Sequence, residues 1–178
     1  APPDPDHPPE PGDAPVIPHM PEWPELSAAF HEPVIGVAEA LASGRSLILI
    51  GAPGTGKSVA LAMIAARAAS GDPAFDGVER APFYLHAGDL IFTEHDVSLD
   101  PFLSAIAHRA STLTATDLRS YVEFKLRNGN ALILLDGLDE IPRGQLEETA
   151  NWLASLLDEH PGNRVIAAGS LNGFGLFS

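Results

Sequence analysis

The stretch that most constrains the fold is residues 51–58, which read GAPGTGKS. They match the pattern G-x-x-x-x-G-K-[S/T] at every fixed position. A short apolar run, residues 46–50, comes immediately before them and predicts a buried strand, and an alanine-rich apolar run, residues 59–69, follows and predicts a helix. In the order strand, glycine loop and helix, several backbone N–H groups and a helix N-terminus converge on one point. The stretch therefore predicts a phosphate-binding loop.

The side chains of this loop have separate tasks. We expect Lys57 to reach the β- and γ-phosphates of a nucleotide, with a part in catalysis, and Ser58 to ligate Mg²⁺. The residues predicted to contact the nucleotide are Gly51, Pro53, Gly54, Thr55, Gly56, Lys57, Ser58 and Val59.

A second motif carries carboxylates at the end of another strand. Residues 131–140 read ALILLDGLDE, so five apolar residues are followed by Asp136. The carboxyl ends of strands are where open α/β sheets bind ligands, and an aspartate there is suited to hold Mg²⁺ directly or through water. Asp139 and Glu140, which follow, are candidates to polarise an attacking water. For both acids a solvated turn is the alternative interpretation.

The rest of the chain predicts alternating strands and helices. The four apolar runs, at 46–50, 82–87, 131–135 and 164–169, are separated by helical segments that include 100–110, 114–129 and 145–160. This order predicts a three-layer α/β fold with a parallel sheet and right-handed crossovers. The helical segment that ends near Gly44 could pack against a base or belong to the core. We interpret His86 as a strand-end or core histidine rather than as a catalyst.

Composition bounds the remaining choices. Residues 1–25 hold ten prolines, six acids and no Lys or Arg, which predicts an extended, disordered linker before a core at 26–178. The net charge of −14 argues against a nucleic-acid partner, and the lack of cysteine excludes disulfides. No apolar run is long enough to span a bilayer and no signal peptide is visible, so we expect a cytoplasmic protein with no membrane partner. The chain lacks an initiator Met and reads as a piece of a longer one.

Together these motifs resemble those of the NACHT NTPases, which belong to the STAND class of signal-transduction ATPases within the AAA+-like group. The resemblance covers roughly residues 36–171 and is carried by G-x-P-G-x-G-K-S, by the strand that ends in HAGDL (86–90), and above all by LILLDGLDEIP (132–142). It implies the strand order 2-3-4-1. It also implies an ATP- or ADP-binding, Mg²⁺-dependent switch that hydrolyses ATP and self-associates, as in prokaryotic-type STAND defence or regulatory proteins.

The chain departs from the family pattern in two respects. The family usually ends its fourth strand in T-S-R, whose arginine senses the terminal phosphate, whereas this chain has Leu171 after Gly169 and Ser170. The family's fifth strand, helical bundle and winged helix also have no counterpart, so we expect a truncated core whose first strand is an open edge. A non-hydrolysing nucleotide-binding assembly module is therefore the alternative function. The base-reading N-K-x-D signature of GTPases does not occur.

Overall fold

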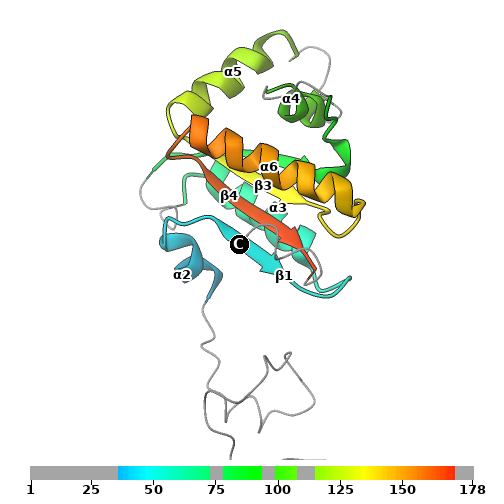
Figure 1. Cartoon of the computed structure of the whole chain (residues 1–178). Helices are drawn as coiled ribbons and strands as arrows, with labels where there is room; N and C mark the ends of the chain where they lie inside the picture. The colour runs from blue at the N-terminus through cyan, green and yellow to red at the C-terminus, as the bar shows by residue number, and fades with distance from the viewer. Residues whose placement is uncertain (1–35, 73–77, 94–98, 108–114, 171–178) are drawn as a thin grey trace, which may run out of the picture. The chain divides into compact units, whose positions relative to one another are not determined.

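Strands and helices alternate along the chain in a computed structural model that describes residues 36–72, 78–93, 99–107 and 115–170 (Figure 1). The elements are α2 (Val37–Ala42), β1 (Leu47–Ile50), α3 (Lys57–Ala69), β2 (Ala81–His86), the 3₁₀-helix η1 (Ala87–Asp89), α4 (Asp100–Ala107), α5 (Ala115–Arg127), β3 (Ala131–Asp136), α6 (Arg143–Glu159) and β4 (Arg164–Gly169).

All four strands are parallel and lie in the order β1-β4-β3-β2. The strand at 164–169 therefore separates the strand before the glycine loop from the strand that ends in Asp136, as the resemblance implied. The register places Ile50 beside Gly169 and His86 beside Asp136. Both pairs lie at the carboxyl ends of their strands, so the glycine loop and the acidic motif share one edge of the sheet.

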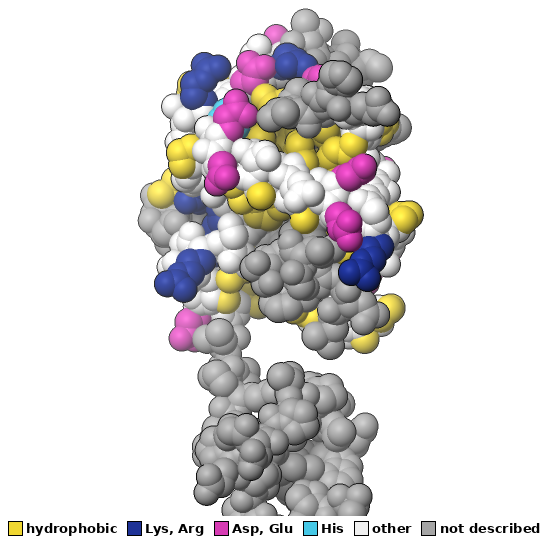
Figure 2. Space-filling model, in the orientation of Figure 1, with side chains coloured by type: hydrophobic (Ala, Val, Ile, Leu, Met, Phe, Trp, Pro, Cys, Tyr) yellow, Lys and Arg dark blue, Asp and Glu magenta, His cyan; other side chains and the backbone are white. Residues whose placement is uncertain are grey.

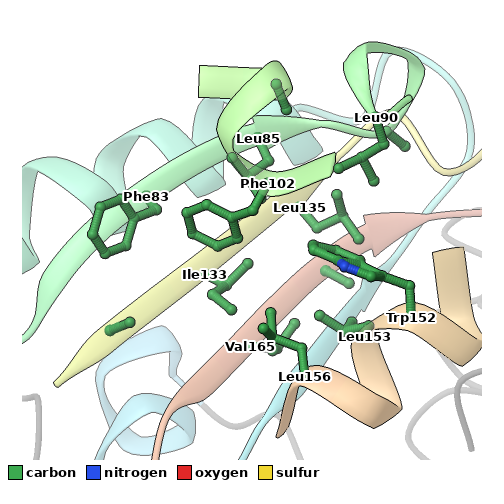
Figure 3. Packing of buried hydrophobic residues seen from close by; sticks show 14 of the residues in the cluster. Phe83, Leu85, Leu90, Phe102, Ile133, Leu135, Trp152, Leu153, Leu156 and Val165 are labelled. Atoms are coloured by element: carbon green, nitrogen blue, oxygen red, sulfur yellow. The ribbon is translucent and has the colours of Figure 1, made fainter. Parts of the chain in front are cut away.

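Helices cover both faces of this sheet, which makes three layers (Figure 1). On one face the side chains of α4, α5 and α6 form a cluster with Ile133 and Leu135, in which the rings of Phe102 and Trp152 lie 6.4 Å apart (Figure 3). The alternate residues of β3 point to the other face and pack against α2 and α3. Because β3 and β4 are buried on both faces, residues 131–135 and 165–168 are apolar without alternation.

The predicted elements are found with shifts of one or two residues at their ends. Ala87 lies in η1 rather than at the end of the second strand, because the His86 side chain accepts a hydrogen bond from the Gly88 N–H and the chain turns there. The helix predicted from Gln145 begins at Arg143. The predicted linker at 1–25, Thr114 and residues 108–110 lie outside the described residues.

A buried arginine of the sheet is hydrogen-bonded to the C-terminal end of α2, the helix before the glycine loop, and to the residues that follow it. Arg164, at the start of β4, is 1 % exposed and donates hydrogen bonds to the carbonyls of Leu41 at 2.6 Å and Arg45 at 2.5 Å. A third, longer bond reaches Ala40 at 3.4 Å. These carbonyls lie at or just beyond the C-terminus of α2, where helix carbonyls lack partners within the helix. Leu41 itself is fully buried, so α2 contributes to the core.

No helix in the described part of the chain is both long enough and apolar enough to cross a membrane. On the face seen in Figure 2, the basic and acidic side chains of the described residues are interspersed rather than grouped into patches of one charge. That the chain has no nucleic-acid partner stays a prediction.

Replacing Arg164 tests how much these hydrogen bonds contribute to stability. Arg164→Met keeps an apolar stem but leaves three buried or half-buried carbonyls without their donor. We expect the free energy of unfolding to fall by about 2–4 kcal/mol, measured by urea denaturation. Arg143→Met is the matched control, since the Arg143 side chain is 86 % exposed. Equal stabilities for the two variants would contradict this assignment.

Candidate nucleotide-binding site

The conformation of the loop between β1 and α3 requires glycine at three positions. Gly54 and Gly56 have φ angles of +81° and +89°, a region that L side chains rarely adopt. A Cβ atom on Gly51 would lie 2.6 Å from Oγ1 of Thr55. Thr55 in turn donates from its hydroxyl to the Ala52 carbonyl at 2.8 Å, which holds the loop closed. The three glycines thus allow the backbone to curl in front of the helix.

The helix that follows presents an uncapped N-terminus. α3 begins at Lys57, and no hydrogen bond from a side chain caps it at Gly56. The first N–H groups of a helix have no partner within it and carry the positive end of the helix dipole. A 13-residue helix that opens on a glycine loop is therefore suited to bind an anion such as a phosphate.

Lys57 folds back over the loop. Its ammonium donates to the carbonyls of Gly51 at 3.0 Å and Ala52 at 3.3 Å, and forms an ion pair with Asp139 at 3.2 Å. The side chains of Lys57 and Asp139 are only 12 % and 18 % exposed. The lysine of one motif is therefore in direct contact with an acid of the other.

Asp136 lies at the tip of β3 and is surrounded by donors. Tyr84, on the neighbouring strand, donates its hydroxyl at 2.5 Å, and the Gly137 N–H donates at 2.9 Å. Burial raises the pKa of Asp136, but the hydrogen bonds from Tyr84, Ser58 and Gly137, together with the charge of His86, outweigh it and bring the pKa below its ordinary value. The carboxylate is therefore ionised at neutral pH, as a cation ligand has to be.

The acidic motif continues as a tight turn that crosses the end of β4. The N–H of Glu140 donates to the Gly137 carbonyl at 3.0 Å and closes the turn. Leu138 is 6 % exposed, and its N–H faces the Ala168 carbonyl at 3.4 Å. A Cβ atom on Gly169 would lie 3.3 Å from that of Leu138, so a larger residue would crowd the crossing. Because the turn crosses the end of β4, Asp139 lies close to Lys57 although the two motifs are on strands that are not neighbours.

His86 fills the space behind the turn. Its Nδ1 accepts the Gly88 N–H at 3.1 Å, so a neutral ring carries its proton on Nε2. Nε2 lies 3.4 Å from Oε2 of Glu140. Gly137 has φ +76°, and a Cβ atom there would lie 2.4 Å from Nε2 of His86. The glycine after Asp136 is thus required by both the turn and the imidazole.

Most of the predicted site residues come together at this edge of the sheet. The loop from Gly51 to Val59, with Lys57 and Ser58, lies beside Asp136 and Asp139, and Glu140 follows on the same turn. Arg143, a candidate substitute for the absent arginine, is exposed at the start of α6 and pairs with Glu147 at 3.5 Å. Leu171 lies outside the described residues.

Sequence reasoning missed Tyr84 altogether and assigned no partner to His86. Both residues lie on β2, two positions apart and therefore on the same face of the strand. The signal that was available is a tyrosine near the end of a buried strand, since a buried phenol hydroxyl usually finds a hydrogen-bond partner.

The donors present fit a divalent cation. The Ser58 hydroxyl is one of the groups that lower the pKa of Asp136, so a hydroxyl and an ionised carboxylate lie together beside the glycine loop. Mg²⁺ is usually held by one or two such protein oxygens with phosphates and water. In the described part of the chain no group of three or more His, Asp or Glu side chains is placed to hold a metal.

The parallel sheet with its glycine loop and acidic strand end defines a P-loop NTPase fold. The family model of the NACHT domain matches residues 45–172, which is most of the chain. The chain therefore belongs to the NACHT family, which consists of nucleotide-binding P-loop NTPase domains of signalling proteins. A search of curated proteins and a search of solved structures return no match.

Replacing Gly137 by alanine tests the packing of the turn against His86. Because alanine meets both a positive φ and the imidazole, we expect Gly137→Ala to lower the free energy of unfolding by about 2–4 kcal/mol. Gly144→Ala is the control, since a Cβ atom there meets nothing within 4 Å and lies in α6. Thermal or urea unfolding measures both. A Gly137→Ala variant as stable as the control would refute the argument.

Proposed function

We propose that this chain binds Mg·ATP or Mg·ADP at the edge formed by residues 51–59 and Asp136, and hydrolyses ATP slowly. The observation that carries the proposal is that Lys57 and the acidic turn meet directly, at 3.2 Å from Lys57 to Asp139, although they belong to separate motifs. Phosphoryl transfer depends mainly on positioning and on charge stabilisation, which such a meeting of loop and turn can supply.

Each residue has a task in this proposal. Backbone N–H groups of the glycine loop and the first turn of α3 hold the phosphates, and Lys57 places its charge on them. Ser58 and Asp136 hold Mg²⁺, which neutralises phosphate charge when bound. Glu140 orients water, and His86 supports its side chain from behind at 3.4 Å. Asp139 is the second acid of the turn, and as a candidate to polarise water it ranks after Glu140.

The proposed function also includes signalling. We propose an ATP-driven switch that self-associates, of the kind found in STAND regulatory or defence proteins, acting in the cytoplasm. The alternative is a non-hydrolysing nucleotide-binding module for assembly. It is favoured by Leu171, which stands where the family usually places an arginine, since arginines at terminal phosphates contribute about 10³–10⁵ in rate.

Binding is tested by Lys57→Ala. A charged hydrogen bond of this kind contributes about 1.5–3 kcal/mol, so we expect Mg·ATP affinity to fall by about one to two orders of magnitude. Calorimetric titration with Mg·ATP and Mg·ADP measures the loss. Lys125→Ala, a change of the only other lysine in the chain, is the control. Unchanged affinity in Lys57→Ala would refute the phosphate-binding assignment.

Hydrolysis is tested by Glu140→Gln in a phosphate-release assay. We expect slow turnover by the unmodified chain, loss of that turnover in the variant by about 10²-fold or more, and unchanged Mg·ATP binding. Glu159→Gln, at the far end of α6, is the control. Binding without turnover in the unmodified chain would favour the assembly module. Turnover unaffected by Glu140→Gln would show that Glu140 does not orient the water.

A further inference from the structure

The ammonium group of Lys57 has three N–H donors, and three oxygen atoms of the protein already face them. Two belong to backbone carbonyls of the loop itself, those of Gly51 and Ala52, and the third is Oδ2 of Asp139. The two carbonyls are part of the closed loop and cannot leave without opening it. Asp139 is the only one of the three partners on a side chain, so it is the partner that a phosphate oxygen can replace.

The two acids of the turn have different neighbours. Asp139 turns toward the glycine loop and is 18 % exposed at its side chain, whereas Glu140 turns toward His86 and is 70 % exposed. A carboxylate that faces a lysine, with only 18 % of its side chain exposed, is poorly placed to contact an attacking water. The geometry therefore separates the acids into a partner of Lys57 and an accessible carboxylate.

We infer that Asp139 is a counter-ion of Lys57 which a nucleotide phosphate displaces, and that it limits nucleotide affinity rather than polarising water. Asp139 lowers nucleotide affinity in two ways. Its carboxylate competes with the phosphate for Lys57, and once displaced it remains a negative charge close to the negatively charged phosphate. This inference rests on the proposed function, since it takes the nucleotide to be the competing anion.

Displacement also links the bound phosphate to the turn. Asp139 lies in the four-residue turn closed by the bond from Glu140 to Gly137, and Leu138 anchors that turn on β4. When Asp139 leaves Lys57, the turn keeps its anchors at Leu138 and at His86 but loses its contact with the loop. Asp139 is thus the point at which the acidic motif responds to occupation of the phosphate site.

The experiment compares Mg·ATP affinity by calorimetry in the full chain and in Asp139→Asn, which keeps the shape of the side chain and removes its charge. We expect the variant to bind Mg·ATP about tenfold more tightly, the size of one charged hydrogen bond no longer in competition. Asp158→Asn, an exposed residue near the end of α6, makes the same change of net charge and should bind as the unmodified chain does.

The outcomes separate the two proposals. Binding by the unmodified chain, with Asp139→Asn equal to it or weaker, would overturn the inference and leave the proposed function standing. A similar gain in Asp158→Asn would show that net charge alone is responsible, and would also overturn it. Failure of the unmodified chain to bind Mg·ATP would refute the proposed function and this inference with it.

Discussion

The site depends on the turn from Gly137 to Glu140, because the sheet order places β4 between the two motifs. Neighbouring strands lie about 4.7–4.9 Å apart, so the tip of β3 and the start of the glycine loop are separated by about 10 Å. A carboxylate at the tip of β3 does not cover this distance alone. The turn crosses the end of β4, buries Leu138 on it, and delivers Asp139 to Lys57 at 3.2 Å.

The small residues at this edge follow from that crossing. Gly169 ends β4 without a side chain where Leu138 passes over it, and Gly137 leaves room for the ring of His86. In turn, the hydrogen bond from Gly88 fixes the imidazole so that Nε2 faces Glu140. The D-G-L-D-E segment is therefore constrained by packing as well as by its carboxylates. Gly137 has to be small because His86 lies against it, and Leu138 packs over Gly169.

Much of the fold could be predicted from the sequence, and so could the placement of the candidate site residues at one edge of the sheet, but the pairing of those residues could not. An apolar run indicates a strand buried on both faces, and the glycine motif indicates a local loop conformation. Both can be predicted because they depend only on residues adjacent in the sequence. The contact between Tyr84 and Asp136 joins residues 52 positions apart, and that between Arg164 and Arg45 spans 119. An arginine that opens a strand gives no local sign that it will be buried against helix carbonyls, because the partners exist only after the sheet has formed.

Local contacts also decide how an acidic chain accommodates an anion. The net charge is −14, yet screening at physiological salt acts over about 8 Å, so distant carboxylates matter little at the loop. The adjacent charges matter more. Lys57 is paired with Asp139, and two further carboxylates follow from Asp136 at the tip of β3 and from Glu140 on the turn. A phosphate that approaches this edge therefore meets the uncapped helix N-terminus and a lysine that already has a partner. The positive charge still needed is that of a divalent cation, for which Asp136 is kept ionised by its hydrogen bonds. Nucleotide and cation are thus expected to bind as one complex, with neither favoured at this site alone.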